Sequence, residues 1–123
     1  MGSEQMVGLA AVALGGAAGA VLRYGLSQAM SSFGEINWGT FTVNFVGCLL
    51  ICFLFFRFAD MGDAAGLFLF VGLFGAFTTM SSVSLEMVQS FAAGMVGYGF
   101  LVFFMNAVIC LGAGFLGRCL ALL

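Results

Sequence analysis

The chain has 123 residues, of which 63% are hydrophobic and 7% are charged, and its formal net charge is −2. An ordinary soluble domain has about 25% charged residues, so this composition excludes one. A membrane-spanning helix needs about 20 apolar residues, and the chain has room for four of them. The apolar runs are continuous and do not alternate as the strands of a β-barrel would. We therefore expect one all-α membrane domain over residues 1–123.

Four segments are predicted to span the membrane, at about residues 6–26, 39–58, 64–91 and 100–120. The connections between them are predicted at 27–37, 57–63 and 92–99, where polar or small residues gather. The four cysteines all lie in apolar runs, without the spacing of a metal site. We expect them to be small packing residues.

The first span carries small residues along one face, at Gly8, Ala11, Gly15 and Gly19. Residues three or four apart share a helix face, and a G-x-x-x-G pair lets two helices approach closely. We therefore predict close helix packing at Gly15 and Gly19. Arg23 follows one turn later, and two interpretations remain open. Its side chain either extends to the lipid headgroups or is a fixed positive charge at the mouth of an anion path.

Polar side chains recur at helical spacing in the second and fourth spans. Thr40, Asn44 and Cys48 are four residues apart and therefore share a stripe. Asn44 is the only amide within the second span. It either forms an interhelical hydrogen bond or donates an N–H group to a permeating ion. The fourth span repeats the spacing with Asn106, Cys110 and Gly114.

Residues 71–86 lie inside the third apolar segment, yet they include two glycines, two threonines, three serines and one glutamate. An ordinary spanning helix avoids this density of hydroxyl groups. A break inside hydrocarbon leaves backbone groups unpaired, which is tolerated only beside protein or water. We therefore predict a discontinuous third helix at an ion or substrate site. Freed carbonyls would suit a cation, and freed N–H groups would suit an anion.

The arginines give the chain only a weak orientation. With four spans, Arg57 and Arg118 lie on one side, and the other side has at most Arg23. This is a weak positive-inside signal, so we expect insertion in both directions. Four helices are also a small bundle in which to bury a broken one. Both points favour an antiparallel homodimer with the break at its two-fold axis.

Three motifs occur in order, one in each of the first three spans. Residues 15–24 read GGAAGAVLRY, residues 39–47 read GTFTVNFVG, and residues 75–84 read GAFTTMSSVS. With these motifs the chain resembles, over nearly its whole length, the Fluc/CrcB fluoride channels. The corresponding family patterns are G-G-x-x-G-x-x-x-R-[YW], G-T-x-x-x-N-x-x-G and G-G-[FL]-[ST]-T-F-S-[ST]-F-S.

The resemblance implies passive export of fluoride from the cytoplasm through two paths in a dual-topology antiparallel dimer, and no enzymatic activity. It implies a multi-pass protein of a bacterial or archaeal plasma membrane, with fluoride and membrane lipid as partners and no nucleic acid. It also implies a structural Na⁺ ion on the dimer axis. The backbone carbonyls of Gly75 and Thr78 would hold this ion.

The resemblance also assigns residues to the fluoride path. Fluoride is small and strongly hydrated, so a pore must replace its water with several N–H and O–H donors. The family's pore asparagine corresponds to Asn44, and its vestibule arginine corresponds to Arg23. The other polar residues expected to line the path are Thr40, Ser81, Ser82 and Asn106.

The chain departs from the family at two positions. The two phenylalanines whose ring edges line the fluoride path are here Met80 and Val83, which lack the positive edge of an aromatic ring. Three explanations stay open. The path conducts without rings, with Met80 as a polarizable lining; a heterodimeric partner supplies the rings; or the chain has been altered at these positions. We favour retained channel function.

Two other functions remain as alternatives. Small multidrug resistance proteins are also four-span, dual-topology dimers, but they exchange protons for a cationic substrate at a carboxylate in the first span. No acidic residue lies between residues 6 and 26, which contain Arg23 instead. The chain could also be a non-conducting subunit of an assembly.

Overall fold

The computed structural model describes residues 1–31 and 36–123. This part of the chain has four helical spans long and apolar enough to cross a membrane, and it contains no strand. The spans are Ser3–Met30, Trp38–Arg57, Asp63–Ala92 and Val96–Ala121. The predicted all-α fold with four spans is therefore confirmed. Part of the predicted connection at 27–37 lies outside the described residues.

Two of the spans are single helices and two are composite. The first is α1 (Ser3–Met30) and the second is α2 (Trp38–Arg57). The third consists of α3 (Asp63–Gly66), the π-helical η1 (Leu67–Leu73), α4 (Phe74–Phe77) and α5 (Met80–Ala92). The fourth consists of α6 (Val96–Phe104), the π-helical η2 (Met105–Ile109) and α7 (Cys110–Ala121). Short π-helical segments inside α-helices are frequent at functional sites.

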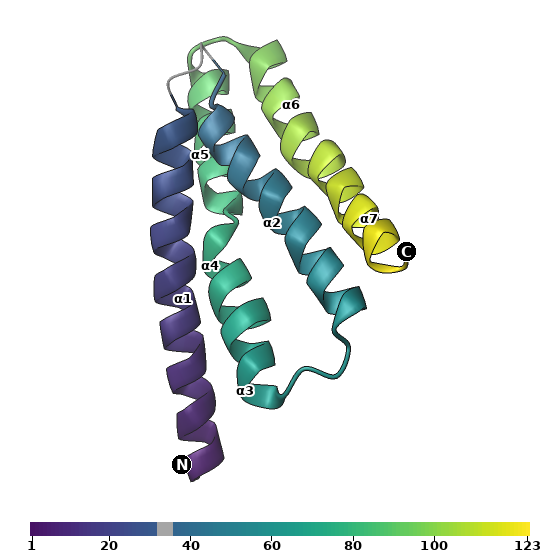
Figure 1. Ribbon diagram of the computed structural model, residues 1–123. Coiled ribbons are helices and arrows are strands. Elements are labelled where there is room, and N and C mark those ends of the chain that lie inside the picture. The colour runs from purple at the N-terminus through teal and green to yellow at the C-terminus, as the bar shows by residue number, and fades with distance from the viewer. Residues whose placement is uncertain (32–35) are drawn as a thin grey trace.

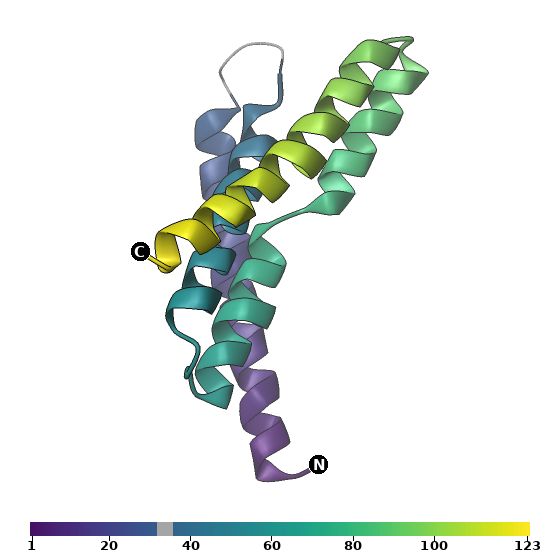
Figure 2. The ribbon, with the colours of Figure 1, turned by 90° about the vertical axis from the view of Figure 1, so that its right-hand side faces the viewer.

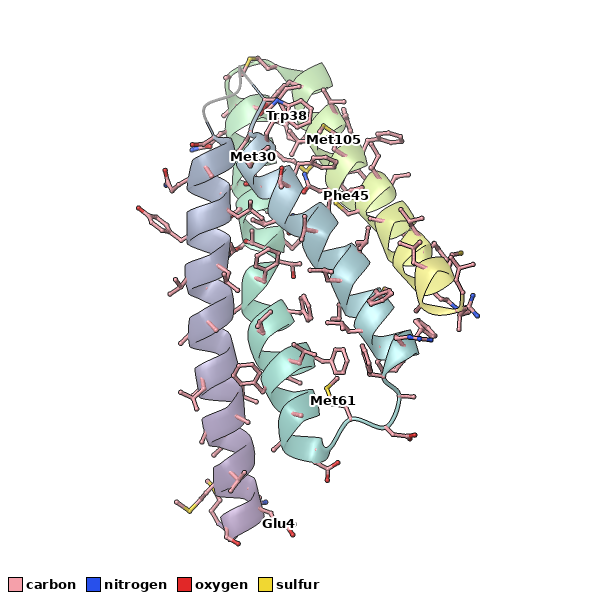
Figure 3. All side chains as sticks on the ribbon, in the orientation of Figure 1. Glu4, Met30, Trp38, Phe45, Met61 and Met105 are labelled. Carbon is pink, nitrogen blue, oxygen red and sulfur yellow. The ribbon has the colours of Figure 1, made fainter. Side chains whose placement is uncertain are left out.

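The first and third spans run in one direction, and the second and fourth run in the opposite direction (Figure 1). α1 packs along η1 and α4, and α2 packs along α7. Figure 2 shows the hairpin of α5 and α6 leaning away from the lower half of the molecule. In Figure 3, Met30 and Trp38 lie at the end of the molecule opposite Glu4. The junction of α4 and α5 is therefore about midway along this elongated bundle.

Gly15 and Gly19 bring α1 into direct contact with the third span. A Cβ atom at Gly15 would overlap the carbonyl oxygen of Phe68, and one at Gly19 would overlap the carbonyl oxygen of Leu73. Both glycines are buried. The close packing predicted from the G-x-x-x-G pair is therefore confirmed, and the partner is the backbone of η1.

Two predicted boundaries differ from the structure. The first span continues to Met30 instead of ending near residue 26, and the fourth begins at Val96 instead of near residue 100. The connection between α5 and α6 is short because Gly94, at φ +78°, adopts the left-handed conformation that glycine allows. Gly99, predicted to lie in the turn, is a helical packing position, since a Cβ atom there would overlap the ring of Phe91.

Candidate functional site

The third span contains two residues with extended backbone. α4 ends at Phe77 and α5 begins at Met80. Between them, Thr78 has φ −83° and ψ 157°, and Thr79 has φ −148° and ψ 110°. The stretch that joins α4 to α5 in Figure 2 is this pair of residues. Backbone N–H and C=O groups in such a stretch need partners outside the helix.

Asn44 of α2 binds both backbone polar groups of Thr79. The Thr79 N–H donates to Asn44 Oδ1 at 2.8 Å, and Asn44 Nδ2 donates to the Thr79 carbonyl oxygen at 3.2 Å. The Asn44 side chain is buried, with 7% of the residue exposed. Because an unpaired backbone group costs several kcal/mol in an apolar interior, this amide stabilises the extended stretch.

Two hydrogen bonds at this stretch take helical partners away from two carbonyls. In an α-helix, the N–H of each residue bonds the carbonyl four residues earlier. The Thr79 N–H instead binds Asn44, so the carbonyl of Gly75 loses that partner. The Ser82 N–H donates to the Thr79 hydroxyl at 3.2 Å, so the carbonyl of Thr78 loses its partner as well. Gly75 and Thr78 are the residues predicted to hold a cation.

Arg23 reaches this region from α1. Its Nε donates to the carbonyl oxygen of Ala76 at 2.9 Å, and the side chain is half-buried. Ala76 lies in the last turn of α4, where a helix end carries partial negative charge that favours a cation. Arg23 therefore binds the third span within the bundle, and its role as a positive charge at the mouth of an anion path stays a prediction.

Asn106, in η2, joins the fourth span to the site. Asn44 Nδ2 donates to Asn106 Oδ1 at 2.8 Å, and Asn106 Nδ2 donates to the carbonyl of Val102 at 3.0 Å. A primary amide has two N–H groups. Those of Asn44 are both used by the protein, on Thr79 and on Asn106. The described residues provide a partner for only one N–H of Asn106.

Hydroxyl groups gather at the start of α5. The Thr79 hydroxyl donates to Ser82 Oγ at 3.0 Å and lies 3.2 Å from Ser81 Oγ. Ser81 is exposed and Ser82 is half-buried. A helix N-terminus carries partial positive charge and favours an anion. The predicted path residues Ser81 and Ser82 therefore lie together in the first turn of α5, next to the extended stretch that Asn44 binds.

The other predicted path residues lie apart from this cluster or differ in burial. Thr40 is buried at the start of α2, where its hydroxyl accepts from Asn37 Nδ2 at 3.1 Å. Within residues 1–31 and 36–123, no side-chain hydrogen bond joins Thr40 to Asn44. Met80 and Val83 differ most, because Met80 is 60% exposed and Val83 is 1% exposed. Val83 therefore belongs to the packed interior of the single chain.

Residues 10–118 match the family described as CrcB-like protein, Camphor Resistance (CrcB). The chain belongs to the CrcB family. It is 37% identical to a fluoride-specific ion channel FluC of Magnetococcus marinus, over 89% of this chain and 93% of that protein. It is 38% identical to a protein of the same name from Agrobacterium fabrum, over 94% and 96% of the two chains. A Thermus thermophilus protein of that name is 42% identical, over 86% and 88%.

Sequence reasoning missed two groups that build the site in this CrcB chain. One is Thr79, whose side chain caps α5 and whose backbone binds Asn44. Threonine is a preferred residue at the N-cap of a helix. The capping role of Thr79 could therefore have been predicted from the sequence. The other is the carbonyl of Ala76 that binds Arg23. Every residue has a carbonyl, so the sequence holds no signal for it.

A large cavity lies elsewhere in this CrcB chain. It has a volume of about 1290 Å³ and is lined by the start of α1, the end of α2 and the residues around α3. None of the residues predicted for the ion path contributes to its lining. This cavity is therefore separate from the hydrogen-bonded junction of Asn44, Thr79 and Asn106.

Proposed function

We propose that this CrcB chain is a fluoride-specific ion channel, a multi-pass membrane protein that lets fluoride leave the cytoplasm passively. Relatives with that name match it at 37–42% identity over most of their length. The observation that carries the proposal is the junction of Asn44, Thr79 and Asn106. It gathers polar groups from three spans inside an otherwise apolar bundle. A polar junction of this kind suits a transport path and not an enzymatic reaction.

The fluoride path uses the donors that the protein itself leaves over. A pore must replace the hydration shell of fluoride with N–H and O–H groups. The second N–H of Asn106 and the hydroxyl hydrogen of Ser82 are such donors, since the Ser82 oxygen accepts from Thr79. Ser81 lies beside them and shares its hydroxyl with Thr79. Asn44 has both N–H groups occupied. It therefore holds Asn106 and the extended stretch in place, and Arg23 supplies the positive charge.

The extended stretch is the break of a discontinuous third helix, buried on the axis of an antiparallel, dual-topology dimer with two paths. Gly75, Met80 and Ser81 flank the stretch and are exposed in the single chain. Hydrocarbon cannot solvate the polar groups of such a stretch. A second copy, related by a two-fold axis, would cover this surface with the same surface of its own.

A Na⁺ ion on that axis fits the carbonyls of Gly75 and Thr78. Both carbonyls lose their helical N–H partners to side chains. A Cβ atom at Gly75 would meet nothing within 4 Å, so its surroundings are open for an ion and a second copy. In the described part of the chain, no three His, Cys, Asp or Glu side chains lie close enough together to hold a metal ion. Uncharged carbonyls alone suit a monovalent cation better than a divalent one.

Conduction in this proposal does not require aromatic rings at positions 80 and 83. Met80 is exposed next to Ser81 and offers a polarizable sulfur to the path. Val83 is packed in the interior of its own chain, so it contributes little surface to an ion. A heterodimeric partner that supplies phenylalanines is the alternative, and it would leave the homodimer silent.

Fluoride efflux from liposomes tests the proposal. The purified chain is reconstituted into vesicles loaded with potassium fluoride, and the released fluoride is followed with a fluoride electrode. A potassium ionophore is added so that the exit of fluoride does not build up an opposing membrane potential. We expect rapid passive efflux of fluoride and little of chloride. Proton-coupled transport of a lipophilic cation would instead indicate a multidrug exporter. No transport of either kind would indicate a non-conducting subunit.

A further inference from the structure

Two cysteines, Cys48 and Cys110, follow Asn44 and Asn106 by four residues each on two spans that pack together. Asn44 and Asn106 are separated by 62 residues, and Cys48 and Cys110 repeat this separation four residues further along the second and fourth spans, in α2 and at the start of α7. Because the two helices run in the same direction (Figure 1), the second pair comes together like the first. The two helices stay close through this turn, because a Cβ atom at Gly114 would lie 3.8 Å from the carbonyl oxygen of Cys48. The sequence predicted only packing residues here, because spacing along one chain does not show which spans are neighbours.

Small residues on α7 hold this thiol pair in a narrow gap between the helices. A Cβ atom at Gly117 would overlap the carbonyl oxygen of Leu49, and one at Gly114 would lie 3.2 Å from Cys52 Sγ. Cys110 is 1% exposed, and Cys48 is half-buried. The backbones of α2 and α7 therefore lie in close contact beside Cys48 and Cys110.

We propose that Cys48 and Cys110 form a binding site for a soft, two-coordinate cation, with mercuric ion as its representative. Thiolates are the protein ligands that soft cations select. Among the described residues no group of three or more His, Cys, Asp or Glu side chains is found, which disfavours a four-coordinate zinc site. Two thiols from two helices match the two collinear bonds that mercuric ion prefers.

The charge balance favours a divalent ion at this site. Binding replaces two S–H bonds with two S–Hg bonds and releases two protons, with no oxidation or reduction. Two thiolates and one divalent cation give a neutral product, so no net charge is left in an apolar interior. Because the bridge would tie α2 to α7 one turn from Asn44 and Asn106, it should also stop fluoride efflux. This last point rests on the proposed function, but the binding itself does not.

Native mass spectrometry of the full-length chain tests the site with mercuric chloride as the probe. The starting variant is Cys52→Ser with Cys119→Ser, which leaves only the proposed pair. We expect one mercury per chain in place of two protons, without chloride, and we expect it to resist a monothiol such as cysteamine. In that background, Cys48→Ser and, separately, Cys110→Ser should instead give an adduct that keeps its chloride and that cysteamine removes completely.

Two mercury atoms per chain, each with its chloride, would show two separate thiols and overturn the site. So would an unchanged, chloride-free adduct after Cys48→Ser. Alanine at each position serves as a second variant in case serine disturbs the helices. In liposomes, a mercury block that survives washing with cysteamine should occur only when both thiols are present. If the chain shows no fluoride efflux before mercury is added, the proposed function is contradicted, and the mercury site is not.

Discussion

The backbone N–H of Thr79 donates to Oδ1 of Asn44 at 2.8 Å. In a continuous helix, that N–H would bond the carbonyl of Gly75. One hydrogen bond therefore has two effects, because it satisfies the extended stretch and removes the helical partner of a carbonyl proposed to bind Na⁺. In the proposed channel, the Asn44 side chain thus contributes to both the anion path and the cation site.

Asn44→Asp should reduce fluoride efflux at least about tenfold. The carboxylate still accepts from Thr79 N–H, but it loses the donations to the Thr79 carbonyl and to Asn106. Each polar group left unpaired costs about 1–3 kcal/mol, and about 1.4 kcal/mol corresponds to a factor of ten in rate. The new negative charge also repels the anion. Gln89→Glu, at an exposed position on α5, adds the same charge and should leave efflux near wild type. Equal efflux from both variants would contradict the role of Asn44.

Asn44 and Asn106 should be energetically coupled in a double-mutant cycle. Their mutual hydrogen bond is 2.8 Å long, and interhelical hydrogen bonds in membranes contribute about 0.6 kcal/mol on average and at most about 1.7. The free energy of unfolding in mixed detergent micelles is measured for Asn44→Ala, Asn106→Ala and the double variant. The cost of the double variant should be smaller than the sum of the single costs by about that amount. Strict additivity would show that the two amides act independently.

Gly19→Ala should lower the free energy of unfolding by about 1–3 kcal/mol, which is the usual cost of overpacking. The new Cβ atom would overlap the carbonyl oxygen of Leu73, which is backbone and cannot move aside. Gly25→Ala, on the same helix, is the matched control, because nothing lies within 4 Å of its Cβ position. Alanine is the better helix former by about 1 kcal/mol, so this control should be neutral or stabilising.

Met80→Phe and Val83→Phe should behave differently. Met80 is 60% exposed and Val83 is 1% exposed. A phenylalanine at position 80 therefore fits without repacking, and it should change efflux by less than about tenfold. Its ring contact contributes about 0.5–1 kcal/mol at an exposed site, by analogy with cation–π pairs. At position 83 the larger side chain should cost about 1–3 kcal/mol of stability.

Leu85→Phe, at a position that is 59% exposed, controls for the added ring on α5. Initial efflux is measured from vesicles that contain at most one dimer each. A native chain that is silent and is rescued by the two phenylalanines would overturn this ranking. It would point to a heterodimeric partner that supplies the rings.

Replacing Na⁺ with a large organic cation should weaken the dimer, its activity, or both. The carbonyls of Gly75 and Thr78 would then face each other across the axis without a charge between them. Dimer fractions are followed by single-vesicle subunit capture across a sodium titration. Magnesium or calcium should not substitute, since no acidic side chain is expected near the ion. An acidic residue observed in the first coordination shell would contradict the proposal.

The sequence by itself determined the four spans and the crossing at Gly15 and Gly19. Spans follow from the length and hydropathy of continuous segments, which are local properties. A glycine stripe shows which face of a helix allows close approach. The motifs in the first three spans were also enough to indicate the family. None of these inferences needs to know which helix is the neighbour.

Only the tertiary structure decided what the polar side chains bind. The spacing of Asn44 gave it a face but not a partner, and the fold supplies Thr79 and Asn106 from two other spans. Arg23 could equally have reached the headgroups until the carbonyl of Ala76 was placed beside it. The sequence predicted the same role for Met80 and Val83, as residues that line the path. In the structure, Met80 is exposed and Val83 is buried. Hydrogen bonds and burial depend on residues far apart in the chain, so no local pattern can specify them.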